Sequence, residues 1–347
     1  MSGEFTNAHP ALAEFWHPVA LSSEVGAEPV AVRAAGQQWA LVRIDGAVRA
    51  FADACPHRRA RLSAGELIGG TLQCSYHGWR FTADGACVAI PALEETASIP
   101  ARANLTRPHG VTESGGFVWL APREPRATVP SISAPRNDGD GLATVLLPAL
   151  RVEANSAMLV DNFLDEAHLP FVHQATIGGA GPEVIPRAEV ARNGLSYTAV
   201  REHTFTNLTD PGVASGERPA VQRRRMTYEY QAPLTATLLL EYLDADGWQF
   251  LTFSVLPEDA TTVRVFQTLT GPGLADAEAA EAAAKYEMSI FDEDLVLQRR
   301  ALSGLEFPLD PAAELHTRAD RVSVEFRRVL AAALSPRPTG PDRPPVS

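Results

Sequence analysis

Two short segments of this chain each bring a cysteine and a histidine together, and this pattern constrains the fold more than any other feature. The first segment is Cys55-Pro56-His57, the second is Cys74-Ser75-Tyr76-His77, and sixteen residues separate them. Thiolates and imidazoles at such spacing are typical ligands of transition metals. Each segment also has a turn-forming residue, Pro56 or Gly78, as loops around a metal centre require. The fold must therefore bring the two segments together.

Two kinds of metal centre use four ligands of these types. A structural zinc site usually pairs Cys with Cys and His with His, as in C-x₂₋₄-C…H-x₃₋₅-H. Here the order is Cys-His-Cys-His with two short, similar arms, which fits zinc poorly. A Rieske [2Fe–2S] cluster instead has two Cys on one iron and two His on the other. The order predicts such a cluster, held by Cys55, His57, Cys74 and His77.

Length and composition fit an enzyme of two domains. The chain has 347 residues, 45% of them hydrophobic, and no apolar run reaches the ~20 residues that span a bilayer. Its net charge of −12 argues against nucleic acid as a partner. The N-terminal residues lack the pattern of a secretory signal, and only Cys87 is left once two cysteines bind the cluster. We therefore expect a cytoplasmic protein without disulfides.

The sequence divides into two parts joined by a connecting segment. Residues 1–122 contain short β segments broken by Gly, Pro and Asp turns, which predicts an all-β domain around the cluster. Residues 123–150 are rich in Pro, Asp and Gly and read as the connection. Residues 151–347 contain a helix over 154–168, several longer strands, and helices over 275–302 and 312–334. We expect an α+β chain whose second domain is a helix-covered antiparallel sheet of the helix-grip, START-like kind.

The second domain contains a further pair of possible metal ligands. His168 and His173 are five residues apart, and Pro170 between them interrupts the helix, so that His173 can turn back towards His168. Two His and one carboxylate form the facial triad of non-haem Fe(II) oxygenases, which leaves coordination positions open. Alone, the pattern also fits a polar helix end. Beside a one-electron carrier, an iron that consumes electrons is the better interpretation.

Over nearly its whole length the chain resembles the Rieske non-haem iron oxygenases. The pattern Cys-x-His-x₁₆₋₁₇-Cys-x₂-His occurs at 55–77, and an Asn/Asp-rich helix ending in His-x₄-His occurs at 162–173. The resemblance implies that an Asp on a late helix completes the iron site, and its motif position selects Asp294. Asp292 and Glu293 are the neighbouring candidates.

The resemblance also implies roles for polar residues near His168. Asp165 lies one helical turn before it. In the family this Asp bridges the iron His to a cluster His of the neighbouring subunit, whereas the alternative is that it only caps a helix. Asn162 is expected beside the iron as a hydrogen-bonding neighbour. One departure is Arg59, where many relatives have Gly.

The short chain and its Tyr-His-Gly-Trp arm resemble the monooxygenase and demethylase branch, which includes vanillate O-demethylase and dicamba monooxygenase. This implies a homotrimeric terminal oxygenase that receives NAD(P)H-derived electrons from a separate ferredoxin or flavin reductase. It would insert one oxygen of O₂ into a C–H bond of an aromatic or polycyclic small molecule, by hydroxylation or O-/N-demethylation. The alternatives are a ring cis-dihydroxylating dioxygenase, an electron carrier with a ligand-binding domain, and a non-redox lipid or hormone binder.

The substrate pocket is expected between the sheet and the segment after His173, with residues 177–182 as a lid or entrance. Four aromatic residues are candidates for its lining, although each also fits the hydrophobic core: Phe163, Phe171, Phe253 and Phe266. No charged residue stands out as an anchor for a substrate carboxylate.

Overall fold

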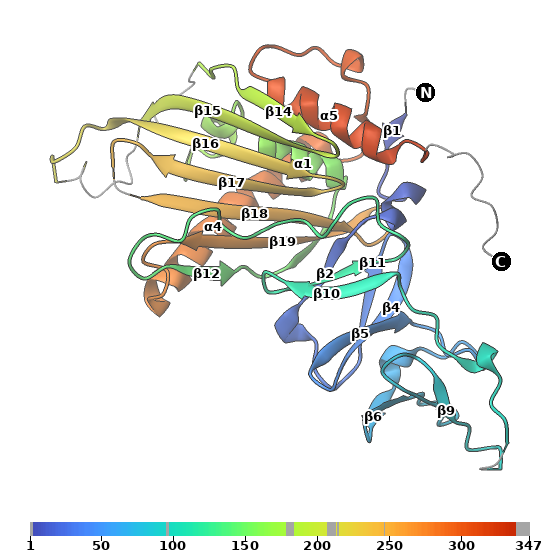
Figure 1. Ribbon diagram of the computed structural model, residues 1–347. Helices are drawn as coiled ribbons and strands as arrows, with labels where there is room; N and C mark the ends of the chain where they lie inside the picture. Colours follow the sequence, from blue (N-terminus) through green and yellow to red (C-terminus); the bar gives the residue numbers. More distant parts are fainter. Residues whose placement is uncertain are drawn as a thin grey trace.

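The structure is a computed structural model that describes residues 3–94, 97–177, 184–206, 213, 215–245 and 247–337. Within these ranges the chain forms a group of small sheets from its N-terminal third and one large sheet with helices from the remainder (Figure 1). The predicted order, a β domain followed by a mixed domain, is therefore present. No helix in the described ranges is long and apolar enough to cross a membrane.

Three antiparallel sheets build the N-terminal part. The first has the order β10-β11-β2, the second β3-β4-β5 and the third β6-β7-β8-β9. Asp45 and Gly46 both have positive φ, 51° and 78°, which is the turn geometry that joins β4 to β5. The bounds are β2 (His17–Leu21), β3 (Val30–Ala34), β4 (Gln37–Ile44), β5 (Ala47–Ala52), β6 (Glu66–Ile68), β7 (Thr71–Gln73), β8 (Arg80–Phe81), β9 (Cys87–Ala89), β10 (Gly110–Ser114) and β11 (Phe117–Ala121).

One eight-stranded antiparallel sheet forms the second part. Its strands follow the order β12-β19-β18-β17-β16-β15-β14, and β13 also pairs with β19. Residues 143–150, which the sequence placed in the connecting segment, supply β12 and the start of β13. The bounds are β12 (Ala143–Leu146), β13 (Leu150–Glu153), β14 (Glu189–Asn193), β15 (Ser196–Thr206), β16 (Val221–Gln231), β17 (Thr235–Tyr242), β18 (Trp248–Pro257) and β19 (Thr262–Gly271).

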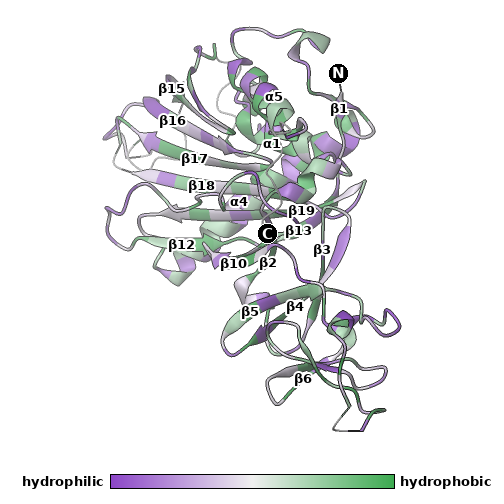
Figure 2. Ribbon diagram, turned by 45° about the vertical axis from the view of Figure 1, so that its right-hand side comes forward, coloured by the Kyte–Doolittle hydropathy of each residue, from purple (hydrophilic) through white to green (hydrophobic). Residues whose placement is uncertain are grey.

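Helices cover one face of this sheet (Figure 1). They are α1 (Ser156–Leu164), α2 (Leu169–Val172), α4 (Ala277–Leu297) and α5 (Arg321–Leu334). Helix α5 shows both hydrophobic and hydrophilic residues along its length in Figure 2, and its buried side chains include Val322, Phe326, Val329 and Leu330. This arrangement confirms the α+β, helix-covered sheet expected from the sequence.

Two helix boundaries differ from the sequence prediction. The helix expected to begin at residue 312 begins at Arg321, because Asp320 Oδ2 accepts hydrogen bonds from the backbone N and Oγ1 of Thr317 and holds a turn there. The helix expected over 154–168 ends at Leu164. Helix α4 continues into a wider π-helical turn over Gln298–Leu302, directly after the segment that contains Asp294.

The two parts share a hydrophobic core. Leu256 and Phe266 of the large sheet are fully buried in a cluster with Trp119 and Leu120 of the small sheets. Phe266, a candidate for the pocket lining, is therefore a core residue at this junction. The loops with the four predicted cluster ligands lie at the opposite tip of the N-terminal part, beside β6 to β9 (Figure 1).

Candidate functional site

The two Cys-His segments form loops with matching backbone hydrogen bonds. In the first loop Cys55 N donates to Ala60 O at 2.8 Å, and Arg59 N donates to Cys55 O at 2.8 Å. In the second, Cys74 N donates to Trp79 O at 2.9 Å, and Gly78 N donates to Cys74 O at 3.0 Å. The structure therefore presents each cysteine at the start of the same kind of tight turn.

Arg59 occupies the position in the first loop that Gly78 occupies in the second. Both residues have left-handed backbones, with φ of 59° for Arg59 and 68° for Gly78. A side chain at such a φ costs about 1 kcal/mol, whereas glycine adopts it freely. This geometry favours Gly at the position, and Arg59 keeps the loop shape despite the cost.

The four predicted cluster ligands gather at one tip. The cysteines are buried, 1% exposed for Cys55 and 2% for Cys74, whereas His57 and His77 are exposed with ring centroids 4.5 Å apart. Burial and the nearby thiol of Cys74 raise the pKa of Cys55 to about 11. An inner pair of thiols and an outer pair of imidazoles is the donor arrangement that a [2Fe–2S] cluster with mixed ligands needs.

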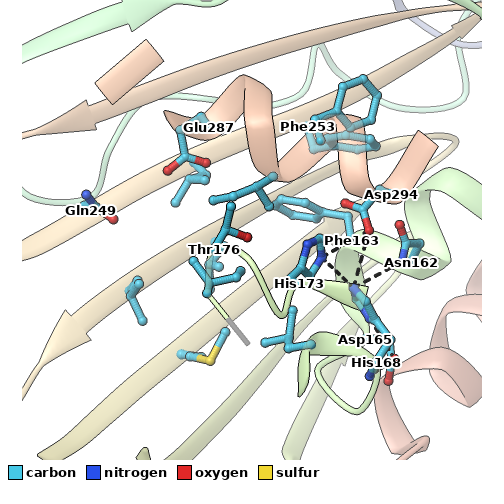
Figure 3. Close-up of a pocket in the computed structure, with 18 of the residues that line it drawn as sticks. Asn162, Phe163, Asp165, His168, His173, Thr176, Gln249, Phe253, Glu287 and Asp294 are labelled. Carbon is cyan, nitrogen blue, oxygen red and sulfur yellow. Dashed lines mark hydrogen bonds and ion pairs between the residues drawn. The ribbon is translucent and has the colours of Figure 1, made fainter. Parts of the chain in front are cut away.

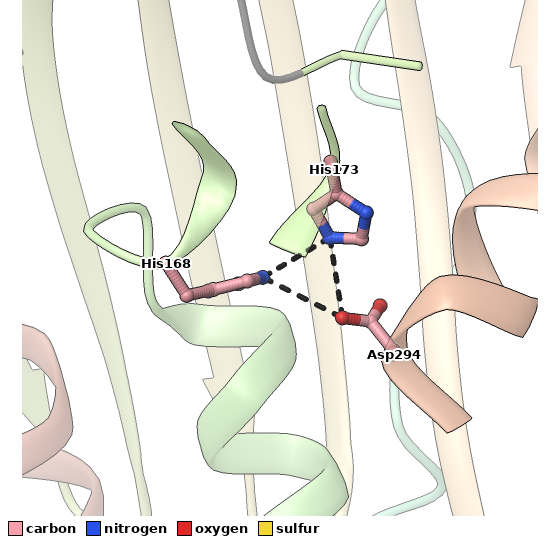
Figure 4. Close-up of side chains that lie close together, drawn as sticks. All are labelled: His168, His173 and Asp294. Atoms are coloured by element: carbon pink, nitrogen blue, oxygen red, sulfur yellow. Dashed lines mark hydrogen bonds and ion pairs between the residues drawn. The ribbon is translucent and has the colours of Figure 1, made fainter. Parts of the chain in front are cut away.

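The second group of predicted ligands also converges, from α2 and α4 (Figure 4). His168 Nε2 lies 3.2 Å from His173 Nε2, and Asp294 Oδ1 lies 3.5 Å from the first and 3.2 Å from the second. Ligands at about 2.1 Å from one ion and at right angles to each other are about 3 Å apart. Asp294 Oδ1 is buried and accepts no hydrogen bond. These three atoms fit a small divalent cation.

Asp165 and Asn162 both contact His168. The N–H of His168 Nδ1 donates to Asp165 Oδ2 at 3.0 Å, which leaves Nε2 free to face the triad. Asp165 Oδ2 also accepts from the backbone N of His168, so it caps this turn as well. Asn162 Nδ2 lies 3.3 Å from His168 Nε2. The structure therefore places both residues beside the triad.

Glu293, a candidate ligand in the sequence analysis, instead contacts the outer side of His173. The N–H of His173 Nδ1 donates to Glu293 Oε2 at 2.8 Å, and Thr176 Oγ1 donates to the same oxygen at 2.6 Å. Each histidine thus donates a hydrogen bond from Nδ1, on the side away from the triad, to a carboxylate of its own. The Glu-Asp pair was the only sequence signal for this contact. Adjacent residues on a helix point about 100° apart, so the two carboxylates approach the histidines from different directions.

Electrostatics within the triad favour a cation. Burial lowers the pKa of His168, but the hydrogen bond with Asp165 and the nearby carboxylate of Asp294 outweigh burial and raise it to about 9. Burial raises the pKa of Asp294, but the two neighbouring histidines have the larger, opposite effect and leave that pKa below its usual value. A cation bound here would replace the proton that His168 otherwise holds, so its affinity should fall at low pH.

A buried ion pair that the sequence analysis missed fixes the loop between α1 and α2. Arg201 Nη1 on β15 lies 2.7 Å from Glu166 Oε1, and both side chains are almost completely buried. His203 Nδ1 lies 3.4 Å from Glu166 Oε2, and Arg224 Nε donates to His203 Nε2 at 2.6 Å. Because Glu166 directly follows Asp165, this network anchors Asp165 to the sheet.

A cavity of about 470 Å³ opens from the triad between α4 and the sheet (Figure 3). Phe163 and Phe253 line it beside the triad, with stacked rings whose centroids are 4.9 Å apart. Phe171 does not line it and is 64% exposed, so its proposed place in the lining or core is wrong. Ile177 lines the cavity, whereas residues 178–182 of the expected lid lie outside the described ranges.

Two family models match consecutive parts of the chain. Residues 15–100 match the model of the Rieske [2Fe-2S] domain, and residues 152–335 match that of the vanillate O-demethylase oxygenase C-terminal domain. Methylxanthine N1-demethylase NdmA from Pseudomonas putida is 27% identical over 331 residues, which cover 92% of this chain and 88% of that protein.

Other relatives match over less of their length. Chlorophyllide a oxygenase from Oryza sativa subsp. japonica is 34% identical over 184 residues, and the match covers 51% of this chain but only 31% of that protein. Among solved structures, dicamba monooxygenase bound to 3,6-dichlorosalicylic acid superposes with a TM-score of 0.78 at 22% identity, covering 96% of this chain and 98% of that one.

Proposed function

Because this chain belongs to the Rieske oxygenases that have a vanillate O-demethylase oxygenase C-terminal domain, we propose that it is the terminal oxygenase of a multicomponent system in the cytoplasm. NAD(P)H-derived electrons would enter from a separate ferredoxin or flavin reductase. The reaction would be hydroxylation or O-/N-demethylation of an aromatic or polycyclic small molecule. The observation that supports this most directly is the convergence of a buried His173 with the half-buried His168 and Asp294 in the wall of a cavity.

In this proposal the residues divide into two metal sites. Cys55, His57, Cys74 and His77 hold the [2Fe–2S] cluster, and His168, His173 and Asp294 hold Fe(II). When bound, the iron activates O₂ and directs one oxygen atom into a substrate C–H bond with electrons from the cluster. The stacked rings of Phe163 and Phe253 position an aromatic substrate beside the triad and exclude water from it.

We further propose that electrons cross between subunits of a homotrimer. Within one chain, the cluster loops lie at the tip of the N-terminal part, well away from α1 and α4 (Figure 1). Asp165 and His168 also line a second, outward groove of about 410 Å³ with Leu305, 54% exposed, and Leu315, 96% exposed. A contact with another chain would cover these two exposed leucines.

Charges support a head-to-tail contact of this kind. Several acidic residues line the groove, whereas the exposed face of the first cluster loop is basic. The acidic residues are Asp161, Asp165, Glu306, Glu314 and Asp320, and the basic ones are Arg58, Arg59 and Arg61. In this contact Asp165 would accept hydrogen bonds from His168 and from His57 or His77 of the neighbouring copy.

The experiment that tests this function uses the full chain loaded with iron and sulfide, a bacterial flavin reductase and NADH. A panel of methoxy- and N-methylarenes is incubated under ¹⁸O₂, and formaldehyde and hydroxylated products are measured. We expect one labelled oxygen in hydroxylated product, with formaldehyde from demethylation. Two labelled oxygens in a cis-diol would support the dioxygenase alternative. A brown protein that passes electrons on without consuming O₂ would support the carrier.

One prediction concerns the carboxylate behind His173. We expect Glu293→Gln to lower the affinity for Fe(II) by about 10- to 100-fold, because the amide orients the imidazole less strongly than a carboxylate. Iron retention is measured by titration with a competing chelator. Asp292→Asn, at an exposed neighbouring position, is the matched control. Equal retention by Glu293→Gln and wild type would remove Glu293 from the site.

A further inference from the structure

Glu287 places a carboxyl group in the wall of the 470 Å³ cavity, away from the triad. It precedes Asp294 by seven residues on α4, which is two turns or roughly 10 Å along the same helix face. Figure 3 shows its side chain among the residues that line the cavity, away from His173 and Asp294. The mechanism proposed above does not use this carboxyl group.

Glu287 has no partner for its charge among the described residues. No hydrogen bond or ion pair joins it to another side chain, and burial alone raises its pKa to about 7. The cavity also contains a cation, Arg224, but that guanidinium already contacts His203, lies over the ring of Phe205 and interacts with the charge of Glu166. A cationic ligand would supply the partner that the described residues do not give Glu287.

Gln249 on β18 lines the same end of the cavity (Figure 3). Its side-chain amide makes no hydrogen bond with the described residues, so it offers one acceptor and two donors to a ligand. Tyr286 on α4 and Tyr242 on β17 also line the cavity, and both interact electrostatically with Glu287. A carboxyl group, an amide and two phenols form a polar end on a cavity whose triad end is aromatic.

We propose that Glu287, assisted by Gln249, determines specificity by binding a protonated amine of an aromatic substrate. One aromatic ring and a short side chain separate this amine from the carbon that is oxidised. The inference rests on the proposed function, because the triad defines which end of the substrate reacts. An ammonium group supplies the positive charge and the N–H donors that the described residues around Glu287 do not provide. The ring then lies between the polar end and the triad, against Phe163 and Phe253.

Binding of three matched probes tests the assignment independently of turnover. The probes are 4-methoxyphenethylamine, uncharged 1-methoxy-4-propylbenzene and anionic 4-methoxyphenylacetate, and their Kd values are measured by calorimetry on the metal-loaded, anaerobic full chain. We expect wild type to bind the amine about 10- to 100-fold more tightly than the neutral probe, as a charge-assisted hydrogen bond provides. Glu287→Gln should lose this preference.

Glu281→Gln is the matched control, because Glu281 lies on the same helix but is exposed and pairs with Lys285 at 2.7 Å. It should keep the full preference for the amine. Equal binding of the three probes by wild type, no binding of the amine, or an unchanged preference in Glu287→Gln overturns the assignment.

The pH dependence gives a second readout. Among the described residues, the charged and titratable groups that line this end are Glu287, Arg224, Tyr242 and Tyr286, and of these only Glu287 changes charge near neutrality. The amine probe stays protonated up to about pH 10. Its affinity should therefore fall as pH decreases through about 7, where the carboxylate becomes neutral. In Glu287→Gln the affinity should be independent of pH over the same range, and a retained pH dependence would contradict the proposal.

Turnover separates this inference from the proposed function. If the chain demethylates the neutral probe as well as the amine, the oxygenase proposal stands and the role of Glu287 fails. If the amine binds with the predicted preference but no probe releases formaldehyde and no O₂ is consumed, the role of Glu287 stands and the oxygenase proposal fails.

Discussion

Asp294→Ala is expected to reduce turnover to about one thousandth of wild type or less while leaving the [2Fe–2S] absorption spectrum unchanged. Loss of one of three protein ligands removes several kcal/mol of metal binding and catalytic stabilisation, and each 1.4 kcal/mol is about a factor of ten. The tip of the N-terminal part that carries the cluster loops lies away from α4 (Figure 1), so the cluster spectrum should not respond. Oxygen uptake with substrate, iron content and the visible spectrum are measured on the same preparation.

The neighbouring acids provide controls for this prediction. Asp292 is exposed on α4, and Asp292→Ala should keep wild-type iron content and turnover. Glu293 contacts the outer nitrogen of His173, so its replacement should weaken iron binding without abolishing it. If Asp294→Ala retains iron and activity while Glu293→Ala loses both, the third ligand is Glu293 and not the Asp294 drawn in Figure 4.

The elements that the sequence could predict are those fixed by local pattern. Turn residues such as Asp45-Gly46 and the apolar spacing of Val322, Phe326 and Val329 predicted strands and a helix that the structure contains. The Cys-His segments predicted two similar loops for the same reason, because a ligand motif prescribes its own turns. The structure of the connecting segment was harder to predict, because the pairing of residues 143–146 with β19 depends on residues more than a hundred positions away.

Long-range contacts explain what the sequence left open at the site. Glu166 and Arg201 lie thirty-five residues apart, and only the position of β15 under the α1–α2 loop brings them to 2.7 Å. Glu287 and Gln249 likewise belong to a helix and a strand whose facing sides cannot be deduced from either segment alone. Motif position proposed Asp294, but only the fold shows that Glu293 reaches His173 from the other side.

Asp165→Asn is expected to leave both metal sites filled and to lower turnover by about 100-fold or more. A carboxylate accepts hydrogen bonds from two imidazole N–H groups, as the proposed contact between subunits requires, whereas an amide presents one acceptor and one donor group. The measurement is the rate at which a chemically reduced cluster is reoxidised in a single turnover with substrate and O₂. Glu281→Gln, which changes an exposed carboxylate on α4 outside this groove, is the control and should react at the wild-type rate.

Mixing subunits decides whether the electron crosses between chains. Asp165→Asn chains keep a cluster, and Cys55→Ser chains keep Asp165, so neither forms an active trimer alone. If transfer runs between neighbours, trimers reassembled from both variants regain part of the activity, because an intact cluster then faces an intact Asp165. A double variant with both changes should restore nothing when mixed with either one. Equal inactivity of every mixture, in samples whose mass shows mixed trimers, would instead place the electron route within a single chain.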